Sequence, residues 1–180
     1  MGFRFIDHFS KFIMSFPVTK NDAVNALNSF KEFCILIAIP IILQTDNGGE
    51  YKNELFKEYC LNNDIKHIFS SPYHPKTKGV IEVSHKEILK NVLLYYSANP
   101  YNFNLKNDIL DEFSIHNNKI HTVTNYKPNE LINNTNEEVF EKVLENIKNT
   151  KPKLNEDDII LNFGNHILVK KNSIKNKKDY

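Results

Sequence analysis

The sequence predicts an α/β fold in which helices flank a mixed sheet. Short apolar runs of strand length alternate along most of the chain with longer segments whose apolar residues recur at helical intervals. Turn-forming residues separate these segments, above all the Asn-Gly-Gly run at 47–49. With 180 residues, of which 41% are hydrophobic, the chain can bury one sizeable core and carry a small appendage.

The N-terminal part predicts a hairpin followed by a helix. Two short apolar strands are expected over 2–8 and 11–17, joined by a polar turn. Apolar residues then recur every three or four positions after Asn21, which predicts a helix capped by Asn21 or Asp22 and ending near Pro40. This helix is expected to lie across the sheet.

The next segment predicts a strand, a helix and another strand. The apolar run 39–43 predicts a short buried strand that leads into Asp46, and with the preceding strand and helix it forms a unit that normally closes a parallel pair. A helix over 53–62 and an alternating strand over 65–69 follow. The residues expected to face inward from this helix are Leu55, Phe56, Tyr59 and Cys60.

The C-terminal half predicts three helices and a small β appendage. Helices are expected from Gly79 to about Ala98, over 105–118 and over 136–149. The core face expected for the first of them comprises Val80, Ile81, Ile88, Leu89, Val92, Leu93 and Tyr96. Two strands, 158–161 and 166–170, are expected to form the appendage, ahead of a lysine-rich end.

Two carboxylates in this arrangement indicate metal chemistry. Asp46 lies where a strand ends, and Glu82 lies in the first turn of a helix, with 35 residues between them. Mg²⁺ prefers hard oxygen ligands and keeps several waters, so two carboxylates on rigid elements suit metal-assisted phosphoryl transfer. Taken singly, Asp46 could be an ordinary turn residue, and Glu82 could favour the helix N-terminus or pair with Lys86.

The motifs around these acids resemble a known family. Thr-Asp-Asn-Gly at 45–48, Ser-Pro-Tyr-His-Pro-Lys-Thr-Lys-Gly at 71–79 and Gly-Val-Ile-Glu at 79–82 resemble the segments that carry the second and third acids of the DDE core in retroviral and gypsy-type LTR-retrotransposon integrases. The segment 116–131 resembles the end of that core, which extends the resemblance over 1–132. The resemblance implies an RNase H-like fold.

The resemblance also implies a domain layout. Residues 1–132 correspond to the catalytic core, 133–150 to a linking helix, and 151–180 to part of a small C-terminal barrel with its lysine-rich tail. The family's first catalytic Asp lies on a strand before the first strand of this chain, so we expect the first strand and the bridging acid to be missing. Asp7 is expected to be a hydrogen-bonded turn residue and no substitute for that acid.

The implied function is DNA integration: metal-dependent 3′-end processing and strand transfer by a pol polyprotein integrase. Asp46 and Glu82 would each bind one of two Mg²⁺ or Mn²⁺ ions. Without the bridging acid we expect the 180-residue chain to be inactive alone, as a fragment of a longer polyprotein or a decayed element copy. DNA is the implied partner, and a homo-oligomer and a nuclear location are implied by the resemblance.

Six residues are candidates for contact with DNA on the helix of Glu82, the loop before it and the turn of Asp46. They are Tyr73, His74, His85, Lys86, Lys90 and Asn47. Lys86 and Lys90 could contact phosphates or form a solvated helix face. Tyr73 and His74 could touch DNA or only shape their loop, and Asn47 could position a hydroxyl or hold its turn.

Composition limits the competing functions. The net charge is only +1 and Arg4 is the only arginine, so sequence-specific base recognition is not favoured. Cys34 and Cys60 are isolated, which indicates neither a disulfide framework nor a zinc site, and the lack of a long apolar run predicts an intracellular protein without a membrane partner. The alternatives are a domesticated non-enzymatic nucleic-acid-binding or dimerisation module on the same fold and, third, another RNase H-like nuclease or resolvase.

Overall fold

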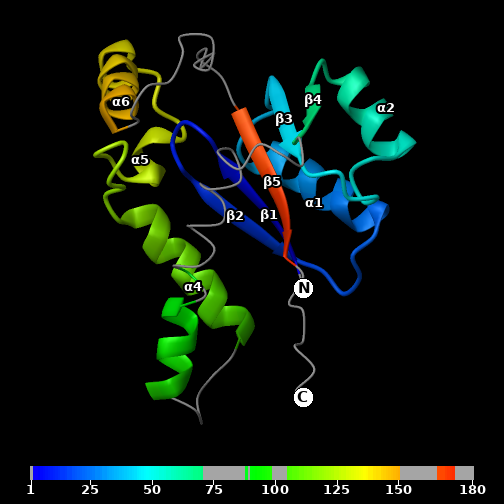
Figure 1. Cartoon of the computed structure of the whole chain (residues 1–180), viewed down its shortest axis with the longest axis horizontal. Helices are drawn as coiled ribbons and strands as arrows, with labels where there is room; N and C mark the ends of the chain where they lie inside the picture. The colour runs from blue at the N-terminus through cyan, green and yellow to red at the C-terminus, as the bar shows by residue number, and fades with distance from the viewer. Residues whose placement is uncertain (1, 71–87, 89, 99–104, 151–165, 173–180) are drawn as a thin grey trace.

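The computed structural model of the protein describes residues 2–70, 88, 90–98, 105–150 and 166–172 (Figure 1). Within this part, five strands form one sheet: β1 (Gly2–Asp7), β2 (Ile13–Pro17), β3 (Ile42–Thr45), β4 (Lys66–Phe69) and β5 (His166–Asn172). Their order across the sheet is β2-β1-β5-β3-β4. β1 is antiparallel to β2 and β5, whereas β3 is parallel to β4 and β5, so the sheet is mixed as predicted.

Helices lie on both sides of this sheet. They are α1 (Ala23–Leu36), α2 (Glu54–Asn62), α4 (Leu105–Asn118), α5 (Pro128–Leu131) and α6 (Glu137–Thr150), with a further helical segment at 88 and 90–98. Among the described helices, none is both long and apolar enough to cross a membrane.

Side-chain caps fix where the first two helices begin. Asp22 accepts a hydrogen bond from the Asn25 backbone nitrogen at 2.9 Å, which identifies Asp22 as the cap of α1. Asn53 accepts from the Phe56 nitrogen at 3.1 Å and caps α2 in the same way. Each cap gives a partner to a backbone N–H group that the first turn of a helix leaves unpaired.

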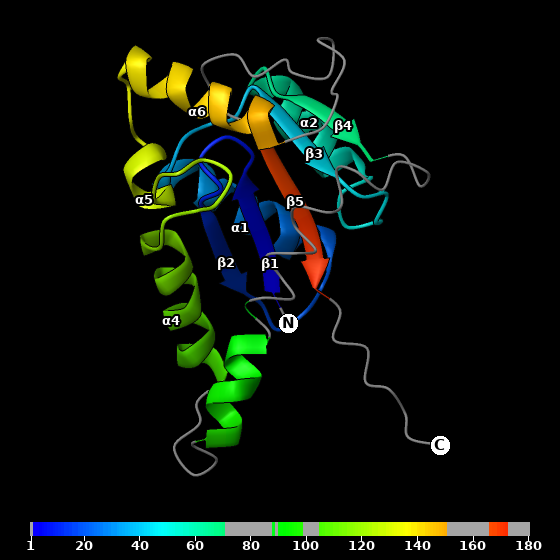
Figure 2. The same cartoon turned by 60° about the vertical axis from the view of Figure 1, so that its left-hand side comes forward.

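The alternation of β1 divides the core into two layers. Phe3 and Phe5 pack with Phe30 and Phe33 of α1 and with buried residues of α2, while Ile6 faces the other way. The second layer joins the sheet to α4 and to the helical segment at 88 and 90–98 (Figure 2), through Ile6, Ile13, Ile88, Val92 and Phe113. A third cluster packs α6 against the turn of the β1–β2 hairpin, where the Phe9 and Phe140 rings lie 4.8 Å apart.

The sheet order corrects two expectations. β2 and β3 do not form the expected parallel pair, because β1 and β5 lie between them. The strand predicted for a C-terminal appendage, 166–170, is β5 and lies inside the main sheet, while the companion strand 158–161 lies outside the described residues. β5 satisfies backbone groups of both β1 and β3 there, which would otherwise be unpaired edges.

Several residues expected in the core are exposed. Leu55 and Leu93 are 44% and 54% exposed, because each lies off the i, i+4 pair that its helix buries, Phe56 with Cys60 and Ile88 with Val92. Tyr96 continues the second stripe and is 46% exposed. The strand predicted at 39–43 starts only at Ile42. Ile39 and Ile41, which the predicted strand included, precede β3 and are 48% and 52% exposed.

Candidate functional site

The ends of β3 and β4 are tied together next to Asp46. The Ser70 backbone nitrogen donates to the Thr45 carbonyl at 2.8 Å, and the Asn47 side-chain amide donates to the Ser70 carbonyl at 2.9 Å. The Thr45 hydroxyl and His67 Nε2 lie 2.9 Å apart. These contacts join two neighbouring strands at the edge where Asp46 emerges, so its backbone is held on both sides.

His67 supports this edge as a neutral ring. Burial lowers the pKa of His67 to about 4, so the imidazole carries no charge at neutral pH. Its ring packs against Phe56 and Phe69, with centroids 6.0 and 4.3 Å away. The residue before Asp46, Thr45, is therefore hydrogen-bonded to an uncharged imidazole.

The Asp46 carboxylate has free coordination capacity. Its Oδ1 accepts a hydrogen bond from the Gly48 backbone nitrogen at 3.0 Å, which makes the short loop an Asx turn. This is the single hydrogen bond to the carboxylate from the described part of the chain. A carboxylate offers about four acceptor positions, so a partly exposed Asp46 keeps oxygen lone pairs for a ligand.

Glu50 and Tyr51 complete the turn. The Glu50 carboxylate folds back over Gly48, where a methyl group on the glycine would lie 2.7 Å from Glu50 Cδ. Tyr51 is 1% exposed, and its ring meets Phe3 and Phe56 edge-on at 6.1 and 5.6 Å. Burial raises the pKa of the Tyr51 hydroxyl far above its usual range, and the nearby Asp46 and Glu50 carboxylates raise it further.

These residues fit one side of a divalent-cation site. Asp46 supplies a hard oxygen ligand, and the buried Tyr51 hydroxyl has no hydrogen-bond partner among the described residues. The described residues contain no group of three or more His, Cys, Asp or Glu side chains that could hold a metal by itself. Glu82, the predicted second ligand, lies outside the described residues.

Asp7 has a different role from Asp46. Its Oδ2 accepts hydrogen bonds from the backbone nitrogen and hydroxyl of Ser10, at 2.6 and 2.5 Å. The side chain is 4% exposed at the turn of the hairpin, and burial raises its pKa. The structure confirms Asp7 as a hydrogen-bonded turn residue.

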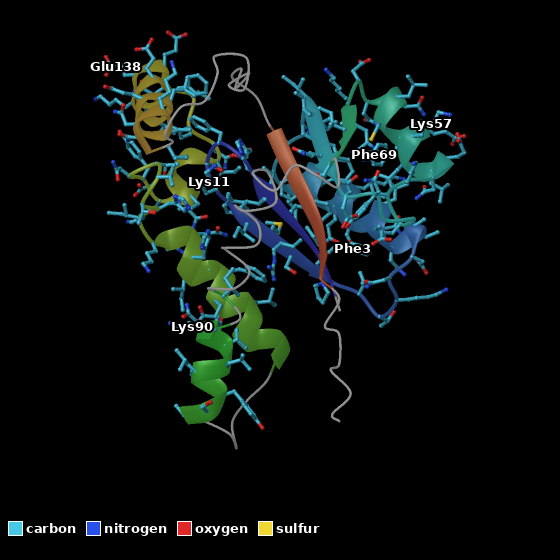
Figure 3. All side chains as sticks on the ribbon, in the orientation of Figure 1. Phe3, Lys11, Lys57, Phe69, Lys90 and Glu138 are labelled. Carbon is cyan, nitrogen blue, oxygen red and sulfur yellow. The ribbon has the colours of Figure 1, made fainter. Side chains whose placement is uncertain are left out.

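The predicted DNA contacts are only partly described. Asn47 holds the turn through its bond to Ser70, the second of the two roles considered for it. Lys90 is exposed and lies beside α4, away from Phe69 at the end of β4 (Figure 3), so the structure does not bring it to the Asp46 turn. The remaining candidates, Tyr73, His74, His85 and Lys86, lie outside the described residues.

The single arginine belongs to the core. Arg4 is 5% exposed, and its guanidinium carbon lies 4.9 Å from the centre of the Phe113 ring. Burial lowers its pKa to about 10, which still leaves it charged at neutral pH. This buried arginine is unavailable for base recognition.

Glu50 and Tyr51 were missed by the sequence analysis. Their placement at the Asp46 turn depends on the packing of Tyr51 against Phe3 of β1 and on the approach of the Glu50 carboxylate to Gly48. A signal was present in the sequence, since a second acid four residues after Asp46 on a glycine turn can approach it.

Comparison with known proteins identifies the relatives of this chain. Residues 3–75 match the integrase core domain family. The chain is 33% identical over 101 residues to the Gag-Pro-Pol polyprotein of squirrel monkey retrovirus, which covers 56% of this chain and 5% of that protein. It is 29% identical over 126 residues to the Pol polyprotein from transposon 412 of Drosophila melanogaster, covering 68% of this chain and 10% of that protein.

A solved structure shares the fold. The HTLV-2 integrase catalytic core domain in complex with magnesium, in a trimeric form, superposes with a TM-score of 0.60 at 21% identity. The superposition covers 71% of this chain and 81% of that one. This similarity confirms the predicted α/β, RNase H-like class of the core.

Proposed function

We propose that this chain, whose residues 3–75 belong to the integrase core domain family of retroviral and retrotransposon pol polyproteins, acts in DNA integration with Asp46 and Glu82 as ligands of a divalent cation. The observation that carries the proposal is the Asp46 turn. A partly exposed carboxylate with unused acceptor positions stands at the end of a strand whose neighbour is tied to it by side-chain hydrogen bonds.

A bound Mg²⁺ or Mn²⁺ would stabilise the attacking and leaving oxygens of an in-line displacement at a DNA phosphate. The chain's own contribution is to hold the ligand oxygens in place. Thr45 and Asn47 fix the two strand ends, so Asp46 needs little rearrangement to present its carboxylate. DNA would be held through its phosphates by Lys86 and His85, with Tyr73 and His74 from the preceding loop.

Strand transfer by the 180-residue chain alone is expected to be weak. Asp46 and Glu82 are the two carboxylates that would hold a divalent cation in this chain, and two-metal phosphoryl transfer draws on more carboxylate ligands than two. Asp7 does not fill this role, because its carboxylate is buried and hydrogen-bonded to Ser10.

The test is cation-dependent stabilisation of the purified chain. Millimolar Mn²⁺ or Mg²⁺ should raise the melting temperature of the wild type and leave those of Asp46→Asn and Glu82→Gln unchanged. Asp64→Asn is the matched control: Asp64 is exposed on the turn after α2 with a φ of 54°, a conformation that Asn also tolerates. A cation shift that survives Asp46→Asn would overturn the assignment of this ligand.

The enzymatic part is tested separately on DNA. Joining of a fluorescent strand with a free 3′-hydroxyl to a second duplex, in Mn²⁺, should be weak in the wild type and absent in Glu82→Gln. Robust joining by the wild type, abolished by Glu82→Gln, would overturn the expected inactivity of the chain alone. DNA binding that ignores Mn²⁺ and Asp46→Asn alike would instead favour the non-enzymatic module.

A further inference from the structure

The turn after β3 brings two carboxylates to the same glycine. The Gly48 backbone nitrogen donates to Asp46 Oδ1 at 3.0 Å. On the other side, a methyl group on Gly48 would lie 2.7 Å from Oε2 and 2.8 Å from Oε1 of Glu50. The Glu50 carboxylate therefore folds back over Gly48, the residue whose backbone nitrogen binds Asp46.

The Tyr51 hydroxyl, which belongs to the residue after Glu50, is buried without a hydrogen-bond partner among the described residues. Tyr51 is 1% exposed, and Phe3 and Phe56 meet its ring edge-on and fix its position. Burial raises the pKa of this hydroxyl, and the carboxylates of Asp46 and Glu50 raise that pKa further. Leaving such a group without a partner is costly, so a water or ion at this place is favoured.

We propose that Glu50 is a positioning residue of the cation site, whose carboxylate, together with the Tyr51 hydroxyl, binds a water of the cation held by Asp46. The inference rests on the proposed function, since it assumes a cation at Asp46. Mg²⁺ and Mn²⁺ keep several waters in protein sites, and those waters need acceptors. The arrangement gives the Tyr51 hydroxyl the partner that it lacks and gives Glu50 a role in orienting the hydrated ion.

Terbium luminescence tests this inference directly. The chain has no tryptophan, so tyrosine is its main sensitiser of bound Tb³⁺, and among the described residues Tyr51 is the tyrosine of the Asp46 turn. We expect Tb³⁺ emission, excited through tyrosine, to saturate on titration of the full chain and to be displaced by Mn²⁺. Tyr51→Phe should remove most of the sensitised emission, and emission that is unchanged in this variant would overturn the placement of the ion.

Measuring the cation affinity together with the melting temperature distinguishes a positioning role of Glu50 from a purely structural one. Outer-shell partners of a metal typically contribute about 10- to 100-fold to its affinity, so Glu50→Gln should weaken Tb³⁺ and Mn²⁺ binding by about 10-fold or more. Glu58→Gln makes the same charge change on the exposed face of α2 and should leave the affinity unchanged. Equal affinities for wild type and Glu50→Gln would overturn the proposal, while a loss in Glu50→Gln with an unchanged melting temperature supports it.

Two glycine variants provide an independent test in which residue 50 itself is not substituted. Gly48→Ala must displace the Glu50 carboxylate and should weaken the affinity, whereas Gly49→Ala meets no atom within 4 Å and should not. Equal affinities for the two would overturn the geometry. If Asp46→Asn abolishes binding but Glu50→Gln does not, the proposed function survives and this inference fails; binding that ignores Asp46→Asn overturns the proposed function itself.

Discussion

The two aspartates at the strand ends of this molecule show how the surroundings of a carboxylate set its role. Asp7 is the last residue of β1 and is 4% exposed, with one oxygen accepting two hydrogen bonds from Ser10. Asp46 follows β3, is partly exposed and accepts one bond from Gly48 among the described residues. Both side chains form turns. The buried Asp7 carboxylate is engaged by hydrogen bonds within the hairpin, whereas the partly exposed Asp46 carboxylate has oxygen lone pairs left for a ligand.

The largest difference is expected on removing each carboxylate. Asp7→Ala leaves the buried Ser10 nitrogen and hydroxyl without an acceptor, which should lower the free energy of unfolding by about 3 kcal/mol. Asp46→Ala removes a single bond at a partly exposed turn and should cost less than about 1 kcal/mol. Urea denaturation measures both, and equal losses would erase the distinction between the turns.

Asn117 tests how firmly the Asp7 hairpin is held from outside. Its buried amide bonds both backbone groups of Ile13, accepting from the nitrogen at 2.9 Å and donating to the carbonyl at 2.8 Å. Asn117→Ala should therefore cost about 2 kcal/mol. Asn117→Asp keeps the acceptor and loses the donor, so an intermediate loss is expected. An unchanged free energy of unfolding in Asn117→Ala would show that the packing of α4 alone fixes the edge strand β2.

The pH dependence of stability should have opposite signs at the two turns. His67 has a pKa of about 4 in the fold and 6.5 unfolded, so its contribution is complete above pH 6.5 and lost as the pH falls to about 4. The ring is partly exposed, so we expect a loss of about 1.5 kcal/mol rather than the full shift. His67→Gln should flatten this slope in denaturation measurements.

Asp7 contributes with the opposite sign. Its pKa is raised in the fold, so the folded state takes up a proton before the unfolded state does, and stability rises as the pH falls through the folded pKa. Asp7→Asn should remove this rise while keeping an acceptor for Ser10. A wild-type profile that Asp7→Asn leaves unchanged would contradict the raised pKa.

The smallest expected effect concerns stability without a cation. Asp46→Asn keeps an oxygen acceptor for the Gly48 nitrogen, so the free energy of unfolding should change by less than about 0.5 kcal/mol in the presence of chelator. The same variant should lose the stabilisation that Mn²⁺ gives the wild type. Thermal melts with and without chelator separate the two quantities. A large loss in chelator would make Asp46 a structural residue like Asp7.

Local sequence signals predicted both turns. An apolar run followed by Asp-Asn-Gly places Asp46 at a strand end. Asp7 is followed by a short polar segment in which a side chain such as Ser10 can donate hydrogen bonds to its carboxylate. The hairpin and most helices follow from periodicity and caps, such as Asp22 and Asn53. These features depend on neighbours within a few residues, so the sequence contains them directly.

Non-local pairing was the part that the sequence could not supply. β5 lies between β1 and β3, more than a hundred residues away from each, and its apolar run is equally compatible with an appendage. The burial of Tyr51 depends on Phe3 from β1, and the face that each helix buries depends on how widely the sheet covers it. Such contacts follow from topology, which periodicity does not encode.

The most direct test of the difference between the turns is paramagnetic broadening by Mn²⁺ in the amide spectrum of the full chain. Mn²⁺ at a substoichiometric ratio should broaden the signals of Gly48, Gly49 and Tyr51 first and leave those of Ser10 and Lys11 sharp. The same signals should stay sharp in Asp46→Asn, which would show that the Asp46 carboxylate holds the ion. Broadening that begins at Ser10, or that is uniform along the chain, would contradict the claim that the turn after β3 is the one open to a cation.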